Sequence, residues 1–148
     1  MKLTVAIDRS IGRTIYRWHL HLYRLSRGVI GHKSPAGPML ILETRGRTSG
    51  LTRSVTLLYY EKDHHYFVVG SNGGRPGHPE WLLNIRHRPD VAVQVGARRF
   101  EAYARAVPSM DEPATWNELV NHYRGWGEYQ KLTHRMISFV ELVPNRQF

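Results

Sequence analysis

Apolar and polar residues alternate along several short segments in the middle of the chain, a pattern typical of β-strands. The predicted strands cover residues 39–44, 53–60, 66–70, 91–95, 100–107 and 136–143. Turn-forming residues lie between consecutive segments at 46–50, at 61–63 and at Gly96, so neighbouring strands are expected to form hairpins. Consecutive hairpins favour an antiparallel barrel or sheet with appended helices over a doubly wound parallel sheet.

An amphipathic helix is predicted over residues 10–27, with Ser10 at its start and Gly28 just past its end. Its apolar face consists of Ile11, Ile15, Trp18, Leu22 and Leu25, and its basic residues are Arg13, Arg17, Arg24 and Arg27. Such a helix either packs on the domain with a solvated arginine face or docks on an anionic membrane surface. Residues 1–37 therefore form a helix with a linker, and residues 38–148 form the β domain.

Three further helices are expected in the second half of the chain. One begins near Pro79 and ends before Pro89. Within it, Trp81, Leu82 and Ile85 are predicted to contact the core, and Asn84 lies on another side, toward ligand or water. The spacing of Ser109 and Glu112 matches a capping box before a helix that runs to about residue 123. Glycines at 125 and 127 are expected to interrupt it before a last short helix that ends near residue 134.

Composition excludes several classes of protein. The 148 residues fit one domain, and 41% hydrophobic with 22% charged residues is typical of a globular chain. The absence of cysteine excludes disulfide scaffolds, thiol catalysis and iron–sulfur clusters. The nine histidines are scattered, so no metal site is expected. No apolar run is long enough to span a membrane, and arginines occupy the place of a signal-peptide core, which predicts a cytoplasmic location.

The chain carries 21 Lys and Arg against 12 Asp and Glu, a net charge of +9, and the basic excess precedes residue 108. This charge suits an anionic partner: nucleic acid, acidic lipid or a phosphorylated ligand. Because no nucleic-acid motif is recognised, a basic nucleic-acid-binding module is only a remote alternative. Common nucleotide-binding, metalloprotease and nucleophile-elbow motifs are also missing, as are paired carboxylates for glycosidase chemistry.

Two glycine-containing loops could bind an anion. Arg45, Arg47 and Arg53 crowd the turn at residues 46–50, where guanidiniums, hydroxyls and backbone amides suit phosphate or carboxylate. The second loop, residues 70–77, follows a strand and precedes a helix, so its amides can face a ligand. The alternatives are a solvated hairpin for the first loop and a flexible linker for the second. The aromatic residues Trp116, Tyr123, Trp126 and Tyr129 form either an apolar lid or part of the core.

Taken together, these motifs resemble the deazaflavin (F420)-dependent nitroreductases and F420H2-dependent quinone reductases of actinobacteria. The ordered match covers about residues 38–143 and consists of Gly46-Arg-Thr-Ser-Gly50 with Arg53, Val69-Gly-Ser-Asn-Gly-Gly74, His78-Pro-Glu-Trp-Leu-Leu-Asn84, Pro89 and Val93-Gln-Val-Gly96. The resemblance implies a split β-barrel like that of the flavin-mononucleotide (FMN)-binding proteins. It also implies an oxidoreductase that transfers a hydride from F420H2 to a quinone, nitro compound or other electron-poor acceptor.

The resemblance further implies roles for individual residues. Those matched to the cofactor site are Arg47, Thr48, Ser49, Arg53, Thr56, Leu57, Ser71, Asn72, Gly73, Trp81 and Asn84. The first three and Arg53 would hold the anionic tail, and the others would lie beside the ring or close the site. An acceptor would lie under Tyr123, Trp126 and Tyr129, with Ser71 and Tyr129 as candidate catalytic hydrogen-bond donors.

Several alternatives stay open at this level. An FMN-binding split-barrel protein or oxidoreductase would use the same arginines for its phosphate. The acceptor of an F420-dependent enzyme could be menaquinone, reached through a peripheral contact of residues 10–27 with the inner face of the cell membrane. A homodimer is also compatible with the fold. No nucleic-acid partner is expected for the F420-dependent enzyme.

Overall fold

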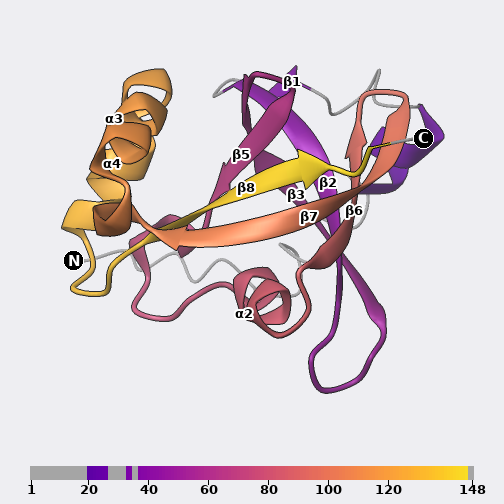
Figure 1. Cartoon of the computed structure of the whole chain (residues 1–148), viewed down its shortest axis with the longest axis horizontal. Coiled ribbons are helices and arrows are strands. Elements are labelled where there is room, and N and C mark those ends of the chain that lie inside the picture. The colour runs from indigo at the N-terminus through magenta and orange to yellow at the C-terminus, as the bar shows by residue number, and fades with distance from the viewer. Residues whose placement is uncertain (1–19, 27–32, 35–36, 147–148) are drawn as a thin grey trace, which may run out of the picture.

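The computed structural model describes residues 20–26, 33–34 and 37–146, and within them eight strands form one antiparallel sheet that curls into an open barrel (Figure 1). The strands are β1 (Lys33–Ser34), β2 (Gly37–Arg45), β3 (Thr52–Leu58), β4 (Tyr60–Lys62), β5 (His65–Val69), β6 (Asp90–Val95), β7 (Arg98–Pro108) and β8 (Ser138–Pro144). Two predicted hairpins are confirmed, because β2 pairs with β3 and β6 with β7. The predicted hairpin between 53–60 and 66–70 is replaced by a shorter one, in which β4 and not β3 pairs with β5.

The barrel takes its shape from the order β1-β2-β6-β7-β8-β5-β4, with β3 on β2. Strand β2 is central to the arrangement because it pairs with β3 and also with β6. The long β7 pairs with both β6 and β8, which joins the two halves of the sheet. The β2–β3 pairing continues to Arg45 and Thr52, past the residues of β2 that pair with β6, and the loop between β2 and β3 projects beyond the rest of the barrel (Figure 1).

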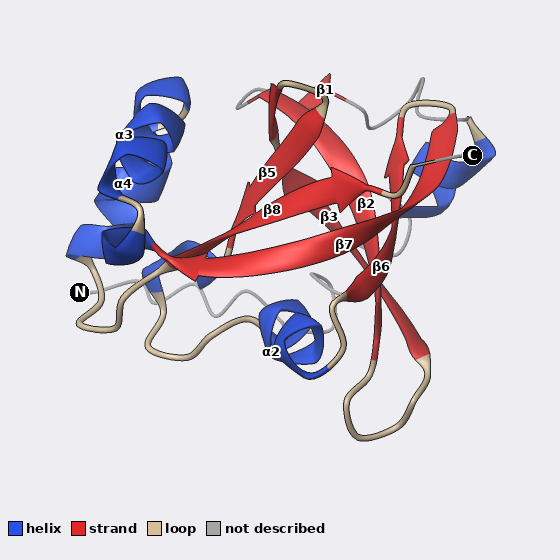
Figure 2. Ribbon diagram, viewed as in Figure 1, coloured by secondary structure: helices blue, strands red, loops and turns tan. Residues whose placement is uncertain are grey.

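Beyond residue 37, the described part of the sheet is covered by the helices α2 (Glu80–His87), α3 (Pro113–His122) and α4 (Arg124–Lys131). In Figure 2, α2 lies at one side of the barrel, whereas α3 and α4 lie together at one end. Short 3-10 turns, η1 (Asn72–Gly74) and η2 (Ser109–Asp111), precede α2 and α3. The α2 boundaries agree with the sequence prediction: Pro79 takes the N-cap position, and the helix ends two residues before Pro89.

The core has two parts because successive side chains of a strand point to opposite faces. On β5 the two faces are buried in different clusters: Tyr66 and Val68 belong to the cluster that α2 covers. Phe67 and Val69 belong to a second cluster, which includes Leu119 of α3 and Trp126 of α4. The first cluster also contains Trp81, Leu82 and Ile85, so the predicted core face of α2 is confirmed.

Some predicted boundaries were wrong. The segment 53–60 is interrupted at Tyr59, which is buried, and residue 60 already belongs to β4. The predicted turn at 61–63 lies at residues 63–64, where Asp63 and His64 have positive φ angles of 53° and 63°. The capping box does not form, since Ser109 lies in η2 and Glu112 occupies the N-cap of α3 without a side-chain cap bond.

The two predicted helix-breaking glycines lie inside α4, and the break between α3 and α4 is at Tyr123, whose φ and ψ are −137° and 102°. The glycines serve close packing instead. A Cβ at Gly125 would come within 2.6 Å of the Tyr123 ring, and one at Gly127 within 2.9 Å of Val120. Gly127 therefore allows close contact between the two helices, and Gly125 leaves room for the Tyr123 ring at the break between them.

Most of the predicted N-terminal helix lies outside the described residues, but residues 20–25 are helical. Tyr23 is fully buried, and its hydroxyl donates to Met39 O at 3.0 Å and accepts from Gly96 N at 2.9 Å. Burial raises the pKa of Tyr23. In contrast, Leu22 and Leu25 of the predicted apolar face are 42% and 84% exposed. These turns are thus joined to the barrel by Tyr23, which lies outside the predicted stripe, and by Arg24, which pairs with Glu43 at 2.8 Å.

Replacing Tyr23 with phenylalanine should lower the free energy of unfolding by about 1–3 kcal/mol, because the Met39 carbonyl and the Gly96 amide lose a buried partner. Urea denaturation measures this as a lower midpoint at unchanged slope. Tyr103→Phe is the matched control, since Tyr103 is 50% exposed. Equal midpoints for Tyr23→Phe and the unmodified protein would show that the hydroxyl contributes nothing.

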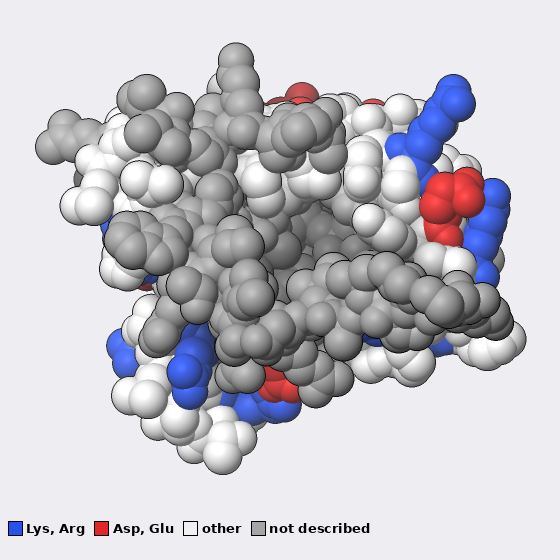
Figure 3. Space-filling view, turned by 180° about the vertical axis from the view of Figure 1, so that it is seen from behind, with Lys and Arg blue, Asp and Glu red and all other residues white. Residues whose placement is uncertain are grey.

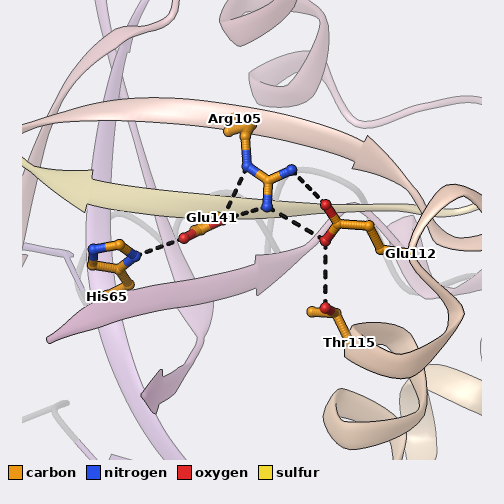
Figure 4. Close-up of polar contacts among 5 residues, drawn as sticks. All are labelled: His65, Arg105, Glu112, Thr115 and Glu141. Atoms are coloured by element: carbon orange, nitrogen blue, oxygen red, sulfur yellow. Dashed lines mark hydrogen bonds and ion pairs between the residues drawn. The ribbon is translucent and has the colours of Figure 1, made fainter. Parts of the chain in front are cut away.

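An ionic network joins the sheet to the start of α3 (Figure 4). Arg105 of β7 donates to Glu112 at 2.7 Å and, through Nε, to Glu141 of β8 at 3.0 Å. Glu141 also contacts His65 Nδ1 at 2.6 Å. Burial opposes ionisation of Glu141, but hydrogen bonds from Arg105 and His65 outweigh it, and the pKa of Glu141 is lowered. The Arg105 hydrogen bond likewise lowers the pKa of Glu112.

Acid should weaken this network. A carboxyl whose pKa is lower in the folded than in the unfolded state stabilises the fold above its ordinary pKa and loses that contribution as pH falls. Arg105→Gln is therefore expected to lower the melting temperature at neutral pH by about 2–4 °C, equivalent to about 1 kcal/mol. The gap from the unmodified protein should shrink as the pH falls below 4, and a gap independent of pH would contradict the role given to the carboxylates.

Candidate functional site

A cavity of about 690 Å³ lies between the β2–β3 loop and α2. Its volume is within the usual range of ligand pockets in proteins. Its lining residues come from the loop and its flanking strands and from α2: Thr44, Gly46, Arg47, Thr48, Ser49, Arg53, Ser54, Val55, Glu80, Trp81 and Asn84. Six residues predicted to bind the cofactor are therefore brought together: Arg47, Thr48, Ser49, Arg53, Trp81 and Asn84.

Arg47 is held in place by two residues of α2. Asn84 Oδ1 accepts hydrogen bonds from the Arg47 amide at 3.1 Å and from Nη1 at 3.0 Å. Nη1 also donates to Glu80 at 2.7 Å, an ion pair whose carboxylate is 79% exposed. The guanidinium is thus oriented before any ligand binds, and preorganisation reduces the entropic cost of binding.

The arginine turn is closed by its own backbone. Gly46 N donates to Leu51 O and Gly50 N donates to Gly46 O, both at 2.8 Å. Gly50 has a φ of 70°, which favours glycine. At Gly46 a Cβ would approach Ser49 Oγ to 2.6 Å and Arg53 Nε to 3.8 Å. The lack of a side chain at Gly46 therefore lets the hydroxyl and the second guanidinium lie close to the chain.

Asn84 is a buried polar residue of this site, 4% exposed, and it lies beside the buried Thr44. Its Nδ2 donates to Thr44 Oγ1 at 3.2 Å, so the amide joins β2 to the loop. The prediction that Asn84 and Trp81 lie on different sides of α2 is wrong, because residues three apart share a helix face and both line the cavity. Asn84 contacts protein groups, and its proximity to Arg47 could not be inferred from residues 37 positions apart.

Other lining residues were missed by sequence reasoning. Thr44, Ser54 and Val55 lie on the strands that flank the turn, and Glu80 begins α2. Strand alternation could have pointed to Arg53 and Val55 as neighbours on one face, but nothing local indicated Glu80. Arg45, grouped with the turn arginines, does not line this cavity; it donates to Gly50 O at 3.3 Å.

The remaining predicted cofactor residues lie outside the lining. Thr56 and Leu57 follow Val55 along β3, and Leu57 packs against the first core cluster. Ser71 is buried, and Asn72 and Gly73 form the η1 turn after it. Asn72 Nδ2 donates to Gly77 O at 2.9 Å. Thr56 and Leu57 thus lie on β3, which lines the cavity, and residues 71–73 lie in the loop that leads to α2, which also lines it.

The aromatic group lies on α3 and α4. Trp126 is 4% exposed within the second core cluster, and its ring meets that of Tyr123 edge-on at 5.3 Å. Tyr123, Tyr129 and Trp116 are partly buried against the same cluster. Burial, together with the hydrogen-bonded Tyr129 beside it, raises the pKa of Tyr123. The core interpretation therefore applies to Trp126, whereas Tyr123 and Tyr129 lie at the edge of the cluster.

The cavity favours anions, since it is lined by two guanidiniums and one exposed carboxylate. Lys and Arg side chains also gather at the lower left of Figure 3, the end of the molecule where the β2–β3 loop projects. Within the described ranges, no group of His, Asp and Glu could hold a metal ion. Nor does any helix in these ranges have the length and apolar character to cross a membrane.

The family model for F420H(2)-dependent quinone reductases matches residues 15–144. The chain belongs to this family. An F420H(2)-dependent quinone reductase of Mycobacterium tuberculosis is 34% identical over 147 residues, which is 97% of this chain and 99% of the relative. As a family member, the chain is an oxidoreductase for which F420H2 is the hydride donor and a quinone is the acceptor.

Solved structures agree with the quinone reductase family. An F420-H2-dependent reductase is 33% identical, with a TM-score of 0.63 over 71% of this chain and 93% of that one. A structure described as a domain-swapped dimer is 27% identical, with a TM-score of 0.67 over 89% and 98%. A candidate pyridoxamine 5′-phosphate oxidase of Listeria innocua, 9% identical, has a TM-score of 0.51 over 73% and 84% and shows the shared fold. The predicted split-barrel fold, like that of the FMN-binding proteins, is thereby confirmed.

The residues present fit an anionic cofactor such as F420. The cavity offers two guanidiniums and the hydroxyls of Thr48 and Ser49 beside a backbone that has no Cβ at Gly46. Guanidinium and hydroxyl donors of this kind suit phosphate and carboxylate oxygens.

Proposed function

We propose that the cavity between the β2–β3 loop and α2 holds the anionic tail of F420H2. The observation that carries this assignment is the orientation of Arg47 toward the cavity by Asn84 and Glu80. Arg53 provides a second guanidinium, and Thr48 and Ser49 add hydroxyl donors on the intervening turn. Together they neutralise tail charge and set the register of the cofactor along β3.

The ring end of the cofactor is proposed to lie beyond the cavity, toward Thr56, Leu57 and the loop at Ser71, Asn72 and Gly73. This proposal is supported by the chain order: Thr56 and Leu57 directly follow lining residues of β3, and the loop at 71–73 precedes the lining residues of α2. Trp81 closes the side of the cavity next to the core, where its ring is 8% exposed. In this arrangement the chain orients the cofactor and excludes water, which lowers the barrier by positioning.

F420H2, when bound, supplies the hydride, and the quinone takes up this hydride and a proton to become a hydroquinone. Ser71 and Tyr129 are proposed to donate hydrogen bonds to the negative charge that develops on the acceptor oxygen. Tyr123, Trp126 and Tyr129 are proposed to cover the acceptor. Because Trp126 is mostly buried, its part in this cover is to support the two tyrosine rings.

A peripheral membrane contact is proposed for the helical residues near the N-terminus. Leu22 and Leu25 are exposed on these turns, so apolar side chains are available for contact, and the sequence of the segment is basic. The test is sedimentation with anionic vesicles at low salt, compared with neutral vesicles. Binding lost in Leu22→Ser, Leu25→Ser would support the contact, and no binding to either vesicle would refute it.

A homodimer is also proposed, since a structural relative with 27% identity is described as a domain-swapped dimer. Light scattering of the purified protein measures its mass directly. A mass of twice 17.2 kDa would support the dimer, and a monomer mass over the working range of concentration would refute it.

The cofactor assignment is tested by titrating the purified protein with F420 and, separately, with FMN while following tryptophan fluorescence. Trp81 lines the cavity and is a natural reporter. We expect binding of F420 and oxidation of F420H2 with menadione as acceptor. FMN binding without F420 binding would contradict the assignment and favour the FMN-binding alternative.

A further inference from the structure

Arg135 lies in the connection between α4 and β8, and its guanidinium contacts three backbone carbonyls of the loop before α2. Nη2 donates to Ser71 O at 2.8 Å, Nη1 to Gly70 O at 3.2 Å and Nε to Arg75 O at 3.1 Å. Nη1 is also 3.3 Å from His78 Nδ1. Among the described residues, no carboxylate forms an ion pair with Arg135. The Arg135 guanidinium therefore binds three backbone carbonyl oxygens of one loop.

The loop needs such a partner because of its backbone shape. Asn72, Gly73 and Gly74 have φ angles of 49°, 63° and 77° in succession, which curls the chain back on itself. Asn72 in this region is unfavourable without outside support. The curl turns several carbonyl oxygens toward one point, where their dipoles repel one another. A cation with a planar array of donors offsets that repulsion.

The other side of Arg135 is fixed to α4. Gln130 Nε2 donates to Arg135 O at 2.8 Å, and Gln130 Oε1 accepts from Ile137 N at 2.9 Å. The loop also meets α4 directly, since a Cβ at Gly74 would lie 3.0 Å from Tyr129 O and 2.9 Å from Leu132 Cβ. Arg135 thus stands between the segment that carries Ser71 and the helix that carries Tyr129.

We infer that Arg135 is a positioning residue for the reaction: it holds the Ser71 loop and the Tyr129 helix in one arrangement, so that both donors face the acceptor together. This inference rests on the proposed roles of Ser71 and Tyr129. The Arg135 guanidinium is bonded to backbone carbonyls of the loop, so its effect on the reaction passes through the backbone at Ser71. Burial and the nearby Arg86 lower the pKa of Arg135, which agrees with a cation that has no anionic partner.

The experiment compares Arg135→Ala, Arg135→Lys and the control Lys131→Gln in F420H2 oxidation with menadione. Lys131 is a neighbouring cation that is 73% exposed and pairs with Glu128 on the same helix, so its removal tests charge alone. A displacement of about 1 Å at a reacting group costs about 100-fold. We expect Arg135→Ala to lower kcat by about that factor and to weaken F420 binding far less, because the tail cavity is intact and only the loop beside the ring is displaced. Lysine cannot span three carbonyls and should restore little.

Millimolar guanidinium chloride should partly restore kcat in Arg135→Ala, whereas sodium chloride at equal concentration should not. Restoration by guanidinium separates positioning from a general loss of fold, which guanidinium at this concentration would not reverse. If Arg135→Ala does not fold, Arg135→Lys with a wild-type melting temperature carries the same test. Wild-type kcat in a folded Arg135→Ala or Arg135→Lys would overturn the inference. Failure of the unmodified protein to oxidise F420H2 would instead refute the proposed function.

Discussion

Replacing Arg47 and Arg53 together with glutamine is expected to weaken binding of F420H2 by about two to four orders of magnitude. Each charged hydrogen bond to an anion contributes about 1.5–3 kcal/mol, and about 1.4 kcal/mol corresponds to a factor of ten. Arg47 should account for the larger share, because Asn84 and Glu80 already hold its guanidinium at the cavity. Fluorescence titration of the double variant at several salt concentrations measures both the affinity and its electrostatic part.

Two controls separate the cavity from the general charge of the protein. Arg98→Gln with Arg124→Gln removes the same charge from exposed positions that do not line the cavity and should leave the affinity within about twofold, since exposed charges are screened. Glu80→Gln keeps a side-chain oxygen that can accept from Arg47 Nη1 but removes the negative charge that competes with an anionic ligand, so the affinity should be equal or stronger. Equal losses in the cavity and control double variants would mean that net charge, and not this cavity, attracts the cofactor.

Local sequence patterns were sufficient to predict most strands of the barrel. Alternation at residues 91–95 with a turn at Gly96 predicted the β6–β7 hairpin, because both the burial pattern and the turn are local properties. Pro79 and Pro89 predicted the extent of α2 for the same reason. The interruption at Tyr59 was not predictable, since residues 53–60 form one run of β-forming side chains and the break depends on how Tyr59 packs in the core.

The arginine turn could be recognised from sequence because its guanidiniums, hydroxyls and glycines are neighbours in the chain. Its partners on α2 could not be assigned. Glu80 and Asn84 reach Arg47 only after β2, β3 and α2 have assembled. The same limit applies to Arg135 and Ser71, which are 64 residues apart, and to the ionic network around Arg105. Contacts of this kind depend on the order of strands in the sheet, which single-residue patterns do not encode.

Two substitutions of Asn84 should change the free energy of unfolding and the affinity for F420H2 in different proportions. Asn84→Ala removes the acceptor of the Arg47 amide and the donor to Thr44, both at a position that is 4% exposed. Leaving those groups unpaired should lower the free energy of unfolding by about 1–3 kcal/mol. The loosened Arg47 side chain should also weaken F420H2 binding, because its orientation is no longer fixed before binding.

Asn84→Asp should mainly weaken F420H2 binding and should cost less stability than Asn84→Ala. A carboxylate can accept the same two hydrogen bonds from Arg47, and the Thr44 hydroxyl can rotate to donate to it, so the local geometry persists. With Glu80 it places a second negative charge beside Arg47, so attraction for an anionic tail is cancelled. We expect the affinity for F420H2 to fall by about 10- to 100-fold and to lose much of its salt dependence, at a smaller loss of stability than in Asn84→Ala. Urea denaturation and titration of both variants measure the two effects side by side. If both variants lose stability and affinity in the same proportion, Asn84 acts through the fold alone and does not orient the charge of Arg47.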